Sequence, residues 1–180
     1  MSRTLFEFSD PDRFVIGTIG APGEREFFLQ ISLGPQVMSF AMEKGQAAAL
    51  AERATELLKE IGKSSIPYEL DTAPLSTPVE SEFAIGVMSL TWSPKDEKIV
   101  FEAQSMADTS GEVVYEELIS DLDPQAPPLL RVQLTSALLR AFVKRTSQVV
   151  SAGRQPCVFC GGPINQDGHL CPRANGYRRT

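Results

Sequence analysis

The side chains best suited to chemistry gather near the C-terminal end of the chain. All three cysteines and the one histidine fall within residues 157–171, as Cys157, Cys160, His169 and Cys171. Thiolates and a neutral imidazole suit Zn²⁺, and two close pairs joined by a short glycine-rich loop can reach one tetrahedral ion. The spacing therefore predicts that these four residues bind a single Zn²⁺ per chain.

The predicted ligand set favours a structural ion over a catalytic one. Three thiolates and one imidazole fill a tetrahedral site, whereas a catalytic zinc keeps one position for water. Gly161 directly follows the second cysteine and allows the positive φ that such a tight turn often needs. The apolar residues of the tail are too few to form a core, so we expect the ion to contribute about 10–16 kcal/mol of apparent folding free energy. These apolar residues are Val158, Phe159, Ile164 and Leu170.

Two other uses of the cysteines fit the sequence less well. A redox Cys-x-x-Cys pair usually begins a helix, and Gly161-Gly162 is a poor helix start. A disulfide framework would leave one of the three cysteines unpaired, and residues 1–10 contain no apolar signal segment. No stretch reaches the roughly eighteen apolar residues of a membrane span. We therefore expect a cytoplasmic protein that does not associate with membranes.

The tail and the body of the chain carry opposite charge. Residues 154–180 hold four arginines against Asp167, a net charge of plus three, and the whole chain stands at minus six, which leaves minus nine on residues 1–153. A basic zinc module beside aromatic rings could contact nucleic-acid phosphates and stack on bases. The candidate contacts are Arg173, Tyr177, Arg178 and Arg179. A basic tail could equally dock on an acidic protein surface, and the net acidity of the chain repels a polyanion at long range.

The body of the chain shows strand and helix patterns in a repeated order. Two apolar runs, residues 13–20 and 25–33, are joined by a turn sequence with Pro22 and Gly23, which predicts a β-hairpin. Residues 37–43 supply a third strand, and residues 45–61 predict an amphipathic helix.

The same pattern returns in the second half of the chain. Residues 83–86, Phe-Ala-Ile-Gly, repeat Phe-Val-Ile-Gly at 14–17, and a helix at 136–151 matches the first helix, with Leu139 in the place of Ala47. We infer two βββα units, residues 13–61 and 82–151. Together they predict an α+β fold with six mainly antiparallel strands under two packed helices. This gives a domain at residues 1–150 and a zinc-binding tail at 154–180 that resembles a zinc-ribbon knuckle.

An acidic insertion, residues 108–128, interrupts the second unit. A short helix at 112–122 is predicted within it. Asp121 and Asp123 could hold Mg²⁺ through their carboxylates, which keeps a metal-dependent phosphoesterase or nuclease as an alternative. With His169 used for zinc, no imidazole remains for a Ser-His or Cys-His pair, and no P-loop or dinucleotide-binding motif occurs. The sequence therefore predicts no catalytic residue.

Several short motifs spread along the chain resemble one family. They are Phe8-x-Asp10-Pro-Asp-Arg-Phe14, Pro22-Gly23-x-Arg25, Glu43-Lys44-x-Gln46 and the ending Gly168-His169-x-Cys171-Pro-Arg-Ala-Asn-Gly-Tyr177-Arg. This pattern resembles an actinobacterial family of conserved hypothetical proteins, domain of unknown function 3090, over about residues 6–179. The resemblance implies no activity. It does imply a context, because members of that family look like one component of a trio whose other components resemble a histidine phosphatase and a lipid-kinase-like protein.

These observations predict a binding or adaptor module with a structural zinc site and a protein partner. Nucleic-acid binding through the basic tail and metal-dependent hydrolysis are the two alternatives.

Overall fold

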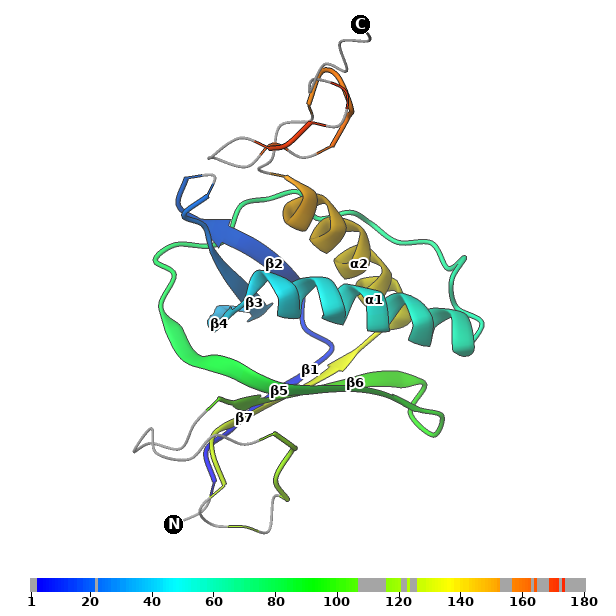
Figure 1. The fold of residues 1–180 in the computed structure, drawn as a ribbon. Coiled ribbons are helices and arrows are strands. Elements are labelled where there is room, and N and C mark those ends of the chain that lie inside the picture. The colour runs from blue at the N-terminus through cyan, green and yellow to red at the C-terminus, as the bar shows by residue number, and fades with distance from the viewer. Residues whose placement is uncertain are drawn as a thin grey trace, which may run out of the picture.

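The computed structural model describes residues 3–21, 23–106, 116–120, 123, 126–152, 157–162, 164, 169–171 and 173. These residues form one seven-stranded sheet and two helices (Figure 1). In chain order the elements are β1 (Leu5–Ser9), β2 (Arg13–Ile19), β3 (Glu26–Leu33), β4 (Gln36–Met42), α1 (Lys44–Glu60), β5 (Ser81–Ser93), β6 (Lys98–Ser105), β7 (Leu129–Leu134) and α2 (Ser136–Ser151).

The sheet consists of two antiparallel meanders joined side by side. The strand order is β1-β7-β6-β5-β4-β3-β2, in which β4 and β5 pair in parallel and β1 pairs in parallel with β7. The sheet curves around α1 and α2, which pack against each other (Figure 1). The predicted α+β class and the mainly antiparallel sheet are confirmed. Neither described helix is long and apolar enough to cross a membrane.

Each meander is followed by a helix, so the order β-β-β-α occurs twice. This order is consistent with the predicted duplication, which itself stays a prediction. The predicted bounds agree closely for both helices, since α2 spans the predicted residues 136–151 and α1 lies one residue earlier than predicted.

The prediction of six strands was wrong, because β1 adds a seventh. Phe8 on this strand is almost fully buried, and Leu5 to Ser9 pair in register with Leu129 to Gln133. The partner strand lies at the far end of the sequence, so the pairing leaves no local signal beyond a short alternation of apolar residues. The N-terminal segment thereby closes the free edge of the second meander.

Aromatic side chains connect the sheet to the helices in the core. The ring of Phe14 on β2 lies 5.3 Å from the ring of Phe101 on β6 and 4.9 Å from that of Phe142 on α2, measured between centroids. All three side chains are at most 1% exposed. Burying one such side chain stabilises the fold by about 1.5–3 kcal/mol, and aromatic pairs add to this. One continuous core therefore includes residues from both halves of the chain.

Both helices begin with a side chain that satisfies a free backbone N–H group. Gln46 Oε1 accepts from the Glu43 N–H at 2.8 Å, and Thr135 Oγ1 accepts from the Leu138 N–H at 3.1 Å. The amide of Gln46 also donates to the carbonyls of Ile85 and Gly86 on β5, at 2.9 and 3.1 Å. Gln46 thus fixes the start of α1 and attaches it to the second meander.

The segment between α1 and β5 contains no helix or strand. Its part around Leu75 packs against Val15 and Phe28, in a cluster separate from the main core. The buried Gln30 side chain donates to Ser76 O at 3.0 Å and accepts from Ser76 N at 2.8 Å, as a strand neighbour would. Leu75 packs beside it against Val15, where a Cβ atom on Gly17 would clash.

A second buried glutamine holds the end of the acidic insertion in the same way. Gln104 Oε1 accepts from Ile119 N at 2.8 Å and from Arg3 Nη2 at 2.9 Å, while its Nε2 donates to Glu117 O at 3.3 Å. The described residues 116–120 form bends and extended chain, not the predicted helix at 112–122. Their backbone groups pair with the glutamine amide and with Arg3 instead of with one another. The rest of that predicted helix lies outside the described residues.

Gly86 and Gly45 allow a matched test of this packing. A Cβ at Gly86 would lie 2.6 Å from Met106 Cα, a backbone atom, whereas a Cβ at Gly45 in α1 would meet nothing within 4 Å. We expect Gly86→Ala to lower the free energy of unfolding by about 1–3 kcal/mol. Gly45→Ala should leave it unchanged or raise it by up to about 1 kcal/mol. Urea denaturation of both variants measures the difference, and equal stabilities would contradict the close packing at Gly86.

Candidate metal centre

The structure brings the four predicted ligand residues together. One donor atom from each of Cys157, Cys160, His169 and Cys171 lies within 4.8 Å of all the others. Cys157 and Cys171 are buried, while Cys160 and His169 are partly exposed. All three cysteines are free thiols, so no disulfide accounts for their proximity. In the part of the chain that the structure describes, no other group of three or more such side chains is close enough to hold a metal ion.

The distances within this Cys₃His group match those around a tetrahedral ion. The Sγ atoms of Cys157 and Cys171 are 3.7 Å apart, and Cys160 Sγ is 3.3 Å from His169 Nε2. Metal–sulfur bonds of about 2.3 Å and metal–nitrogen bonds of about 2.0–2.1 Å give tetrahedral edges of roughly 3.8 Å and 3.5 Å. The group could therefore hold one metal ion with little rearrangement.

A tight backbone turn positions the first two cysteines. Cys157 N donates to Gly162 O at 2.7 Å, and Gly161 N donates to Cys157 O at 2.8 Å. Gly161 adopts a φ of 72°, in the left-handed region that glycine enters without a steric penalty. The turn also aims backbone N–H groups at sulfur, from Phe159 to Cys157 and from Gly162 to Cys160, each at 3.4 Å. We call residues 157–162 the knuckle.

The pKa values of the two thiols in the knuckle are shifted in opposite directions. Hydrogen bonds from the backbone N–H groups of Cys160 and Phe159 lower the pKa of the Cys157 thiol. The Gly162 N–H acts in the same direction on Cys160, but burial and the neighbouring thiols outweigh it and raise the pKa of that thiol. One thiolate is therefore stabilised by the fold alone, whereas several adjacent thiolates require a nearby positive charge. A metal cation, if bound, would supply that charge.

The apolar side chains around the Cys₃His group point into solvent. Val158 is 90% exposed, Phe159 is 61% exposed and Leu170 is 88% exposed. They form no core with one another or with the body, whose core cluster contains only residues before the tail. The donor group itself is thus the buried centre of the described tail.

Of the other predicted site residues, Arg173 and Asp123 belong to the part of the chain that the structure describes. Arg173 Nη1 donates to Phe159 O at 3.3 Å, which holds its guanidinium against the knuckle. Tyr177, Arg178 and Arg179 lie outside the described residues, as does Asp121. The backbone N–H of Asp123 donates to Ser120 O at 3.1 Å.

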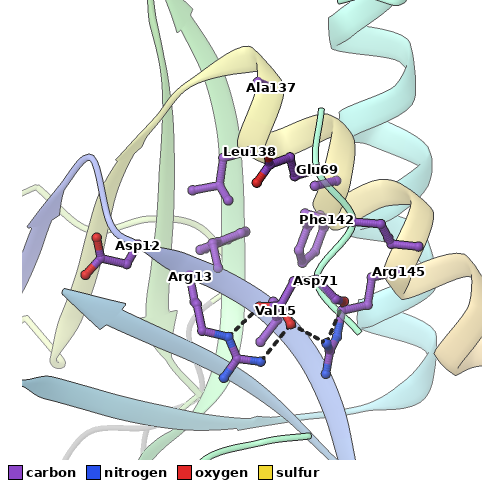
Figure 2. A pocket seen from close by; sticks show the side chains of 12 residues that line it. Asp12, Arg13, Val15, Glu69, Asp71, Ala137, Leu138, Phe142 and Arg145 are labelled. Atoms are coloured by element: carbon purple, nitrogen blue, oxygen red, sulfur yellow. Dashed lines mark hydrogen bonds and ion pairs between the residues drawn. The ribbon is translucent and has the colours of Figure 1, made fainter. Parts of the chain in front are cut away.

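Sequence reasoning missed a pocket bordered by Arg13, Asp71 and Arg145, which lies in the body (Figure 2). A signal was present, because Arg145 follows Phe142 by three residues and so falls on the buried face of α2. A charged residue on the apolar face of a helix needs a partner or a function.

A family model described as a protein of unknown function (DUF3090) matches residues 6–171. No curated protein and no solved structure matches the chain significantly.

The left-handed backbone of Gly161 offers a test of the knuckle. We expect Gly161→Val to weaken the affinity for added Zn²⁺ by roughly five- to thirtyfold, since forcing a side chain into this region costs about 1–2 kcal/mol. Gly161→Asn is the matched control, because asparagine tolerates the same backbone better. Competition with a chromophoric chelator measures both affinities. Equal affinities for the two variants would show that metal binding does not depend on this turn.

Proposed function

The chain belongs to that family of unknown function, and we propose that it is a binding protein whose Cys₃His group holds one structural Zn²⁺ and whose knuckle contacts a protein partner. The observation that carries the proposal is the convergence of the donor atoms of Cys157, Cys160, His169 and Cys171 within 4.8 Å. These residues are far fewer than a folded core requires, yet they adopt a defined geometry.

The donor chemistry supports zinc over other common ions. Mg²⁺ and Ca²⁺ take oxygen ligands, and the group offers three sulfurs and one nitrogen. Four protein ligands complete a tetrahedral shell and leave no position for water or substrate, which is the pattern of structural zinc sites. When bound, the ion would supply positive charge and rigidity to the tail.

The exposed side chains beside the metal group support a binding role. Val158, Phe159 and Leu170 are largely exposed and lie next to the four donors in sequence and space. Exposed apolar groups on a rigid frame are typical of protein contact sites, and aromatic residues contribute much of the energy there. A structural ion would hold these three side chains in place without a core beneath them.

Nucleic-acid binding is a second candidate, and one contact favours it. Arg173 Nη1 donates to the backbone carbonyl of Phe159, so a guanidinium is bound to a residue whose aromatic ring is exposed. A cation for phosphate and a ring for stacking are the two elements of a single-strand binding surface. The arginines that would extend this surface are Arg178 and Arg179, together with Tyr177.

Zinc content tests the metal site directly. Native mass spectrometry of metal-replete protein should find one Zn²⁺ per chain. Cys160→Ser should weaken binding by more than about tenfold, because even changes outside the ligand shell cost about 10–100-fold. Val158→Ser, in the same turn, should retain the ion because Val158 is 90% exposed and donates no ligand. If wild-type protein contains no zinc under these conditions, the proposed zinc site is wrong.

Affinity capture separates the two binding roles. Wild-type protein in native lysate should retain a protein in stoichiometric amount, and Phe159→Ser with Leu170→Ser should lose it while still carrying zinc. If the retained material instead disappears with nuclease and with Arg178→Glu and Arg179→Glu, the nucleic-acid role is favoured. If neither pair of substitutions changes the captured material, the tail has no role in protein binding or in nucleic-acid binding.

A further inference from the structure

A pocket of about 360 Å³ opens in the body of the protein (Figure 2). Its walls come from the start of β2, the segment at residues 69–71 and one side of α2. This volume lies within the range of about 300–1,000 Å³ that small-molecule sites occupy.

One side of the pocket is a cluster of two arginines around a single carboxylate. Arg13 is bound to Asp71 through two nitrogens, Nε to Oδ2 and Nη2 to Oδ1, the latter at 3.1 Å. Arg145 Nη1 donates to Asp71 Oδ1 at 3.2 Å and to the Asp71 carbonyl at 2.7 Å. Both guanidinium groups keep the pKa of Asp71 below its ordinary value, with the hydrogen bond from Arg13 as the largest cause. The cluster therefore carries a net charge of plus one.

Hydrogen bonds hold both guanidinium groups in place and leave some of their N–H groups without a partner. Arg145 Nε donates to Ile16 O at 2.9 Å, and Arg13 Nη2 also reaches the carbonyls of Ala73 and Pro74. Within the described residues, neither Arg13 Nη1 nor Arg145 Nη2 has a hydrogen-bond partner. Guanidinium N–H groups of this kind are donors that bind the oxygens of a carboxylate or a phosphate.

Burial makes the excess positive charge significant. Arg145 is only 8% exposed, and burial lowers its pKa, an effect that Asp71 opposes and Arg13 increases. A buried charge without full compensation is unfavourable. Among the described residues the other carboxylates of the pocket, Asp12 and Glu69, form no ion pair with these arginines, so a second anion at this position would balance the charge that Asp71 leaves.

The remainder of the pocket is largely apolar. Leu138 and Phe142 of α2 line it, and Figure 2 shows Glu69 beside them, apart from the ion-pair network. Asp12 also borders the pocket, but its Oδ2 already accepts from Gly34 N at 2.7 Å. Asp12 and Glu69 line the same pocket and would repel a second negative group, so the part of a ligand near Glu69 must be neutral or cationic.

We propose that this pocket binds a small organic anion, with one carboxylate or phosphate group on Arg13 and Arg145 and an apolar body against Leu138 and Phe142. This site is independent of the Cys₃His group and of any zinc. It gives the body of the protein a ligand of its own.

NMR titration of the full-length protein tests the proposal with three probes: benzoate, phenyl phosphate and inorganic phosphate. At least one aromatic probe should shift the side-chain N–H resonances of Arg13 and Arg145 saturably, with a dissociation constant of about 1 mM or below. The ratio of the two aromatic affinities identifies the preferred anion. Inorganic phosphate should bind more weakly than phenyl phosphate, because it cannot bury a ring.

Variants assign the binding to this pocket. Arg13→Gln should weaken the better probe at least about tenfold, the effect of losing one charge-assisted hydrogen bond. Arg140→Gln is the matched control. Arg140 lies on α2, as Arg145 does, but it contacts Tyr68 and Ile66, which do not line the pocket. The control should change the affinity by less than about twofold. Ala137→Phe should block binding by filling the pocket, which Ala137 lines, and it decides the question if Arg13→Gln fails to fold.

The proposal is overturned by any of three results. The first is no saturable shift for either aromatic probe up to about 10 mM, far above a functional range. The second is equal loss of affinity in Arg13→Gln and Arg140→Gln, which would indicate general charge attraction. The third is unchanged binding in Ala137→Phe, which would place the probe elsewhere.

Discussion

The parallel pairing of β4 with β5 is the constraint on which the rest of the body depends. A three-stranded meander with one helix buries too little apolar surface to be stable alone, and the core cluster includes residues from both meanders. Yet β4 and β5 are joined by a short, irregular ladder, with Ser39 opposite Ser81 and Ala41 opposite Ala84. Side chains reinforce this junction, since Gln46 of α1 binds two carbonyls of β5 and Ser81 Oγ accepts from Ala41 N at 2.9 Å. The helices therefore unite the sheet as well as cover it.

Much of this architecture could be predicted from local pattern. The helices are long and strongly periodic, with Ala47, Ala54 and Leu139 on the expected buried face, so their positions were nearly correct. The four metal-site residues could be identified because their types are rare in the chain and their spacing is compact. In both cases the residues that form the pattern lie close together in the sequence.

The features that could not be predicted depend on partners distant in sequence. β1 becomes a strand because β7 accepts it, and residues 116–120 avoid a helix because Gln104 and Arg3 take their backbone groups. Asp71 acquires its role only when the fold places Arg13 and Arg145 on either side of it. The local sequence does not indicate such contacts, because Arg13, Asp71 and Arg145 are each an ordinary polar residue in a strand, loop or helix.

The hydrogen bond from Arg145 to the carbonyl of Ile16 also affects how these molecules can meet one another. β2 is the last strand of the sheet, and the exposed backbone of a terminal strand is a template on which another chain can add a strand. Here a guanidinium from α2 already occupies one of those acceptors, at the middle of the strand. A strand added by another molecule would have to displace this hydrogen bond and leave the buried guanidinium without that acceptor, so the contact disfavours strand addition at this position.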